Sequence, residues 1–100
     1  MLSELKSQIG VAVQDIDAEA RRALKIPKSQ RGALVVKVRQ GSRASFAGLR
    51  RGDVIIKVNG RPTINSKTFI QAVGKVASGK LVRLMVRRSG ARLFIAVKKP

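Results

Sequence analysis

The stretch GSRASFAGLRRGDVIIKVNGRP, residues 41–62, contains most of the information about the fold. Its first part predicts one helical turn, because Ser42 can cap a helix start and Gly48 can end the helix with a positive φ. The alternating run DVIIKVNG predicts a strand, and its Asn-Gly pair suits a tight turn. The residues of this strand expected to face the core are Val54, Ile56 and Val58.

The flanking sequence adds short elements on both sides of this stretch. Upstream, residues 9–14 alternate like a strand, Asp17 can cap a helix that ends before Pro27, and GALVVKVRQ is a second strand. Downstream, Ser66 can cap a helix that Gly79 ends, and two alternating strands flank a Ser-Gly turn. Five or six strands with two substantial helices predict a mostly β, α+β fold, a curled sheet or partly open barrel capped by helices.

The composition excludes several classes of function. One hundred residues suggest a single domain. The chain has no histidine and no cysteine, so it lacks the commonest general base, the commonest metal ligand and any thiolate. We therefore expect no autonomous catalysis, no metal and no cofactor. The first ten residues contain no apolar run like a signal peptide, and no run is long enough for a membrane helix.

Charge is unusually large and unevenly placed. The net charge is +17; residues 1–20 hold four of the five acids against one base, and residues 21–100 hold 21 bases against one acid. Such a field attracts nucleic acid, anionic lipid or acidic proteins. One observation argues against nucleic-acid binding. Two of the three phenylalanines fall on apolar faces of the expected elements, whereas proteins that bind single strands expose aromatic residues among their basic side chains. The bases expected at the surface are Lys57, Lys67, Arg83, Arg87 and Arg92.

Gly10 interrupts the first expected strand, within SQIGVAVQD at residues 7–15. A glycine there weakens a strand and leaves no side chain to pack. It marks either a bulge of purely structural importance or a point where another molecule approaches the backbone closely.

The stretch from Gly41 to Pro62 resembles the signature of PDZ domains, specifically those of the HtrA/Deg family of bacterial serine proteases. That pattern runs through a G-S-x-A turn, A-G-L, x-G-D-V-I, and V-N-G with a proline, and each part is present here with the right spacing. One departure is Arg43, where the family usually has proline. The resemblance extends over residues 8–98 and is greatest to a second PDZ unit in the bacterial, permuted arrangement. It implies an N-terminal extension at residues 1–7 and a tail at residues 99–100.

The resemblance also implies a peptide-binding groove between the first strand and the long helix. Such domains bind extended peptides by β-augmentation. The carboxylate-binding loop would comprise Gln8, Ile9, Gly10 and Val11, whose backbone N–H groups would point at the terminal carboxylate of the peptide. The strand that pairs with the peptide would comprise Val11, Ala12, Val13 and Gln14. The pocket for its last side chain would be lined by Ile9, Val11, Val13, Phe69, Ile70 and Val73, and the two helix residues Phe69 and Val73 are equally well explained as core.

The implied function is capture of hydrophobic C-termini or unfolded segments, in the service of a periplasmic HtrA-type protease and chaperone. Acidic residues in the peptide, or anionic surfaces, would suit the excess of bases. Two alternatives stay open. The domain could act mainly as an assembly contact with neighbouring protease or PDZ domains, or the chain could be a small basic protein that binds nucleic acid.

Overall fold

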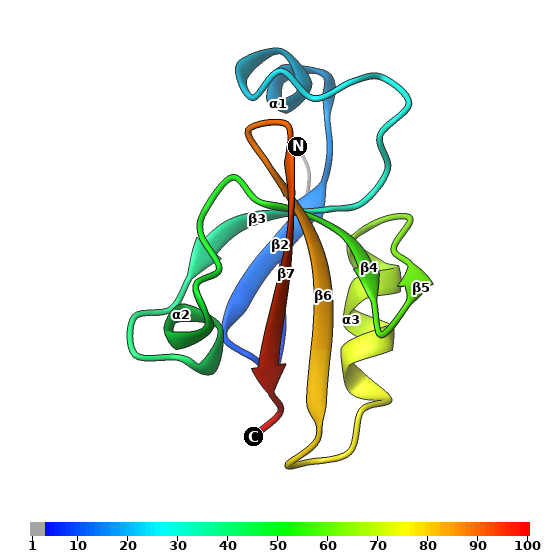
Figure 1. The fold of residues 1–100 in the computed structure, drawn as a ribbon. Helices are drawn as coiled ribbons and strands as arrows, with labels where there is room; N and C mark the ends of the chain where they lie inside the picture. Colours follow the sequence, from blue (N-terminus) through cyan, green and yellow to red (C-terminus); the bar gives the residue numbers. More distant parts are fainter. Residues whose placement is uncertain (1–3) are drawn as a thin grey trace.

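The computed structural model describes residues 4–100, and Figure 1 shows a single curled antiparallel sheet with helices around it. Its strands follow the order β1-β2-β3-β4-β6-β7, and β5 pairs with β4 alone. The strands are β1 (Leu5–Lys6), β2 (Val11–Asp15), β3 (Ala33–Val38), β4 (Val54–Val58), β5 (Arg61–Pro62), β6 (Leu81–Arg88) and β7 (Ala91–Lys98). The helices are α1 (Ala18–Ala23), α2 (Arg43–Ala47) and α3 (Ser66–Gly74).

This architecture confirms the mostly β fold that the sequence predicts. The expected strands and both substantial helices are present, and the predicted helical turn is α2, capped by Ser42 and ended by Gly48 at φ +99°. The two strands that sequence patterning did not reveal are β1 and β5, each two residues long. Such short strands show no alternation, so the sequence contains no signal for them. No helix within residues 4–100 is long and apolar enough to cross a membrane.

Two register shifts change which side chains face the core. They occur where β2 pairs with β3 and where β4 pairs with β6. A bulge reverses the alternation of side chains along a strand, so Val35 and Ile55 are completely buried in the main core. Ile56, expected to face inward, is only partly buried in a second, smaller cluster. The prediction for Ile56 was therefore wrong, because simple alternation does not anticipate the bulge.

The ends of α3 differ from the prediction. Its N-cap is Asn65, not Ser66, and Asn65 Oδ1 accepts a hydrogen bond from Thr68 N at 2.8 Å. The helix ends at Gly74, not Gly79. There the Nζ of Lys99, a buried residue expected in the C-terminal tail, donates to the carbonyls of Gly74 and Val76. A cation at a helix C-terminus satisfies carbonyls that have no partner within the helix.

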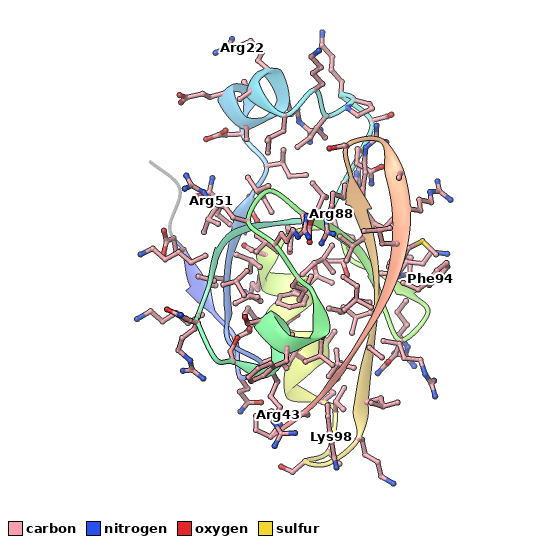
Figure 2. All side chains as sticks on the ribbon, turned by 60° about the vertical axis from the view of Figure 1, so that its left-hand side comes forward. Arg22, Arg43, Arg51, Arg88, Phe94 and Lys98 are labelled. Atoms are coloured by element: carbon pink, nitrogen blue, oxygen red, sulfur yellow. The ribbon has the colours of Figure 1, made fainter. Side chains whose placement is uncertain are left out.

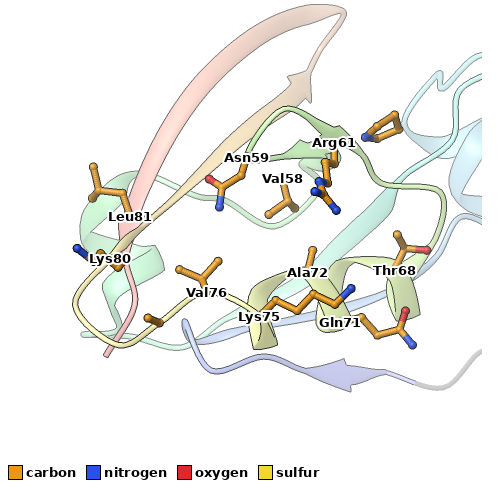
Figure 3. A pocket seen from close by; sticks show the side chains of 12 residues that line it. Val58, Asn59, Arg61, Thr68, Gln71, Ala72, Lys75, Val76, Lys80 and Leu81 are labelled. Atoms are coloured by element: carbon orange, nitrogen blue, oxygen red, sulfur yellow. The ribbon is translucent and has the colours of Figure 1, made fainter.

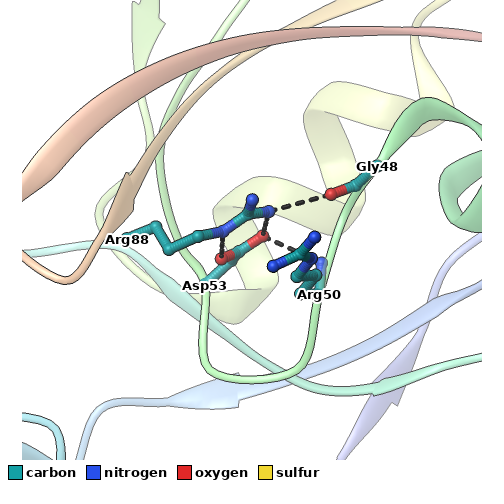
Figure 4. Close-up of polar contacts among 4 residues, drawn as sticks. All are labelled: Gly48, Arg50, Asp53 and Arg88. Carbon is teal, nitrogen blue, oxygen red and sulfur yellow. Dashed lines mark hydrogen bonds and ion pairs between the residues drawn. The ribbon is translucent and has the colours of Figure 1, made fainter.

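The buried Asp53 and the partly exposed Arg88 form an ion pair that joins the start of β4 to the end of β6 (Figure 4). Arg88 donates from Nε and Nη2 to the two carboxylate oxygens of Asp53, both at 2.7 Å, and Nη2 also donates to Gly48 O. Arg50 N donates to Asp53 Oδ2 at 2.9 Å. The hydrogen bonds to Asp53 raise the pKa of Arg88, against the opposing effect of burial. The turn at residues 50–53 is thus held by polar contacts within the chain.

The phenylalanines are less buried than the sequence suggested. Phe69 is completely buried in α3, whereas Phe46 is 83% exposed and Phe94 is 79% exposed. Figure 2 shows Phe94 at the surface of the β6–β7 hairpin. The expectation that two of the three rings lie on apolar faces was therefore wrong, and the argument against nucleic-acid binding that rested on it no longer holds.

Candidate functional site

The predicted carboxylate-binding loop lies in a tight turn between β1 and β2. Ser7 N donates to Val11 O at 2.9 Å, and Gly10 N donates to Ser7 O at 3.3 Å. The loop is joined to α2 because Ala44 N donates to Ile9 O, and to the end of β3 because Arg39 N donates to Gly10 O. The turn is therefore held at a fixed place at the start of β2.

Gly10 is required by this turn on geometric grounds. Its φ is +96°, a conformation that residues with a side chain rarely adopt. A Cβ placed there would lie 2.2 Å from Ser42 Cβ and 2.6 Å from Ser42 Oγ. The close approach at Gly10 is thus made by the N-cap of α2, within the chain itself.

The residues of the predicted peptide-pairing strand and of the predicted pocket lie close together, but most of them are buried in the hydrophobic core. All four residues of the predicted peptide-pairing strand belong to β2. Val11, Ala12 and Val13 are buried, and Gln14 is partly buried. Ile70 is the partly buried member of the predicted pocket, while Gln8 in the loop is exposed. The other five predicted pocket residues are each no more than 2% exposed: Ile9, Val11, Val13, Phe69 and Val73.

Asp15 fixes the angle between β2 and α3. Its Oδ1 accepts from Ser66 N at 2.8 Å and from Ser66 Oγ at 2.7 Å. These bonds lower the pKa of Asp15, the backbone bond most, against a smaller opposing effect of burial. No local sequence pattern indicates this contact, because 51 residues separate the partners.

β1 occupies the edge of β2 that lies away from β3. It runs antiparallel to β2, with Leu5 opposite Val13 and Lys6 opposite Ala12. It also contacts α3, and Figure 3 shows it passing alongside that helix. Neither β1 nor Ser7, whose carbonyl and hydroxyl engage the loop, was anticipated from the sequence.

Two clefts flank this region. One, of about 670 Å³, lies between α3 and the β4–β5 hairpin (Figure 3) and is lined on the helix by Thr68, Ala72 and Lys75. Ile70 lies on the other flank of the helix, by helical spacing. The second cleft, of about 610 Å³, includes Gly10 and Val11. It is surrounded by four bases, Lys6, Lys37, Arg39 and Arg51. An anionic group near the loop would therefore lie in a positive field.

Comparison with known proteins places the chain in a family. Residues 7–98 match the sequence profile of the PDZ domain. The chain is 34% identical over 90 residues to a probable periplasmic DegP-like serine endoprotease of Hahella chejuensis, and 31% identical over 90 residues to the periplasmic serine endoprotease DegP of Escherichia coli. Each match covers 90% of this chain and 19% of the relative. The chain thus spans about a fifth of these relatives.

Solved structures agree with the sequence matches. The PDZ domain of HtrA3 bound to a phage-derived ligand, FGRWV, superposes with a TM-score of 0.74 at 26% identity, covering 98% of this chain and 86% of that one. The HtrA-type protease AlgW with a decapeptide has the same fold, with a TM-score of 0.81 at 21% identity over 97% of this chain and 29% of AlgW. PDZ domains are non-catalytic interaction modules, and the catalytic domain of the relatives lies outside the matched region. The chain belongs to the PDZ domain family, in the group found in DegP-like and other HtrA serine endoproteases.

Proposed function

We propose that this domain binds extended peptides with an apolar C-terminus, as the recognition module of a periplasmic HtrA-type serine protease. The peptide would pair with the β2 edge, residues 11–14, beside Ile70 of α3. Its carboxylate would bind the N–H groups of the loop at residues 8–11. The observation that carries the proposal is that this edge of β2 already pairs with an antiparallel strand next to α3, with loop N–H groups directed at its end.

Peptide binding tests the proposal directly. The pentapeptide FGRWV, the ligand of the HtrA3 domain, serves as the probe in acid and amide forms. We expect micromolar binding of the acid and at least about tenfold weaker binding of the amide, because charge-assisted hydrogen bonds to a carboxylate are about twice as strong as neutral ones. Equal affinity for both forms would contradict the assignment of the carboxylate loop.

A matched pair of α3 variants tests the groove. Ile70→Ser should weaken peptide binding several-fold, about the effect of losing part of a buried apolar contact. Gln71→Ser is the control, because Gln71 is exposed and lines the cleft on the other flank of α3. An equal loss of affinity in both variants would place the peptide elsewhere.

A second candidate function, binding to an anionic lipid surface, is favoured by the outer face of β4, β6 and β7. Met85 is paired with Lys57 on one side and with the exposed Phe94 on the other, so all three share this face. None of the five acids of the sequence belongs to β4, β6 or β7, and Asp53, which directly precedes β4, is buried. We call this surface the cationic face; it comprises Lys57, Arg83, Met85, Arg87, Arg92 and Phe94.

Vesicle sedimentation distinguishes this function from general charge attraction. We expect binding to phosphatidylcholine vesicles that contain phosphatidylglycerol, none to phosphatidylcholine alone, and weakening as salt rises. Phe94→Ser should reduce binding several-fold, because an inserted ring loses its apolar contact. Phe46→Ser, on α2, is the control with a similarly exposed ring. Equal losses, or preferential binding of single-stranded DNA at physiological salt, would overturn this function.

A further inference from the structure

β1 has the position and direction expected of a bound peptide. It lies on the edge of β2 opposite β3, contacts α3, and runs antiparallel to β2. Its last residue, Lys6, leads directly into the loop where the proposed ligand would end. A peptide and β1 would need the same backbone groups of β2, and a strand edge can pair with only one partner at a time.

Ser7 engages the loop groups that a terminal carboxylate would use. Its carbonyl accepts from Gly10 N and its Oγ accepts from Val11 N, both at 3.3 Å. These bonds are longer than the usual range for N–H to oxygen. A carboxylate makes shorter, charge-assisted bonds to the same kind of donor, so it would strengthen these two bonds. In exchange, the two bonds that Ser7 donates to Val11 O, from N at 2.9 Å and from Oγ at 2.8 Å, would be given up.

Leu5 takes the place of an apolar ligand side chain. It is directly opposite Val13, which is completely buried, so both side chains point to the core side of the sheet. Leu5 is partly buried against the main core. Lys6, next along the strand, is exposed on the outer face. The remaining attachment of this segment is an exposed ion pair, Glu4 to Lys37 at 3.8 Å, a kind that adds little stability.

We infer that the segment Glu4–Ser7 is a built-in competitor that closes the peptide-binding edge and must detach before a peptide can bind. This inference rests on the proposed function, since it concerns the regulation of the same site. The apparent affinity for a peptide is then the intrinsic affinity multiplied by the fraction of molecules in which β1 is detached. Three residues of the segment, Leu5, Lys6 and Ser7, pair with β2, so a longer peptide gains more backbone bonds than it displaces.

A reversible disulfide tests the inference in one protein. Ser7 and Val11 form a hydrogen-bonded pair, so the next pair, Lys6 and Ala12, is a non-hydrogen-bonded pair with close Cα atoms. The double variant Lys6→Cys, Ala12→Cys can therefore form a cross-strand disulfide, and the chain has no other cysteine. We expect the oxidised protein to bind FGRWV at least about tenfold more weakly than the reduced protein, because the detached state is removed. Equal binding in both redox states would overturn the inference.

A single substitution with a matched control provides a test without a crosslink. Leu5→Ser removes the apolar contact and should tighten FGRWV binding several-fold while it lowers the melting temperature. Lys28→Ser is the control, at an exposed position between α1 and β3, and should leave affinity within about twofold. Unchanged or weaker binding by Leu5→Ser would show that β1 is purely structural. Absence of binding in every variant, reduced double variant included, would instead overturn the proposed function.

Discussion

Gly10 shows how one residue can have a structural role at the site of a proposed function. Its positive φ and its contact with Ser42 mean that any side chain there would strain the turn between β1 and β2. The same conformation directs two loop N–H groups at Ser7. A substitution at Gly10 would therefore disturb folding and binding together, so substitutions on β1 and α3 are the informative ones.

At the same scale, the buried Asp53 carboxylate is stabilised by several donors. Arg88 provides two and the Arg50 amide a third. Removing one member of such a pair leaves an uncompensated buried charge, whereas a satisfied pair is tolerated. Thr63 differs, because its buried hydroxyl has no hydrogen-bond partner within residues 4–100. The turn at residues 50–53 is thus fixed by side-chain contacts, whereas Thr63 is held by its backbone, whose N–H donates to Ile56 O at 2.9 Å.

At the scale of elements, β2 and α3 form the two sides of the proposed groove, and Asp15 joins them through Ser66. The lowered pKa of Asp15 means that the carboxylate stabilises the fold above its ordinary pKa of 3.8, and that this contribution is lost as pH falls through the lower folded value. Asp15→Asn keeps an acceptor but loses the charge. We expect it to reduce the free energy of unfolding at neutral pH by about 0.5–1 kcal/mol, a small value because Asp15 is exposed.

The measurement is urea unfolding of both proteins between about pH 6 and pH 2.5. The difference between wild type and Asp15→Asn should shrink as the wild-type carboxylate is protonated. In a Ser66→Ala background, which removes the hydroxyl donor, the difference at neutral pH should be smaller. A difference that stays constant across this pH range would contradict the proposed role of the Asp15 charge.

The sequence predicted the long elements of the fold, and it missed what long-range contacts determine. Periodicity and turn residues identified α3 and the β6–β7 hairpin because these depend on neighbouring residues. The bulge at Ile56 and the N-cap at Asn65 were missed because each depends on the partner strand or on competition between adjacent caps. β1 is too short to show an alternating sequence pattern, and it forms by pairing with the free edge of β2. The PDZ signature predicts a peptide site beside β2 and α3, and that site stays a prediction. The signature carries no information about which segment lies on this edge of β2 in the free domain.

At the scale of the whole molecule, 22 bases against five acids make self-repulsion a cost of folding. The cationic face contains a local example of this repulsion, because Arg87 and Arg92 are directly opposite each other on β6 and β7. Like charges at such positions destabilise a strand pair. Arg92→Glu should therefore raise the free energy of unfolding by about 0.5–1 kcal/mol at low salt, and the gain should decrease in about 0.5 M NaCl.

Lys28→Glu provides the matched control, since it makes the same change in net charge at an exposed position between α1 and β3. Thermal unfolding at low and high salt compares the two variants. If the two stabilise equally, the repulsion is spread over the molecule and the Arg87–Arg92 pair has no particular cost. If Arg92→Glu stabilises more and also weakens vesicle binding, the domain retains a destabilising pair of charges that serves an anionic surface. That outcome is expected of a functional cationic face, where charges kept for binding lower the free energy of unfolding.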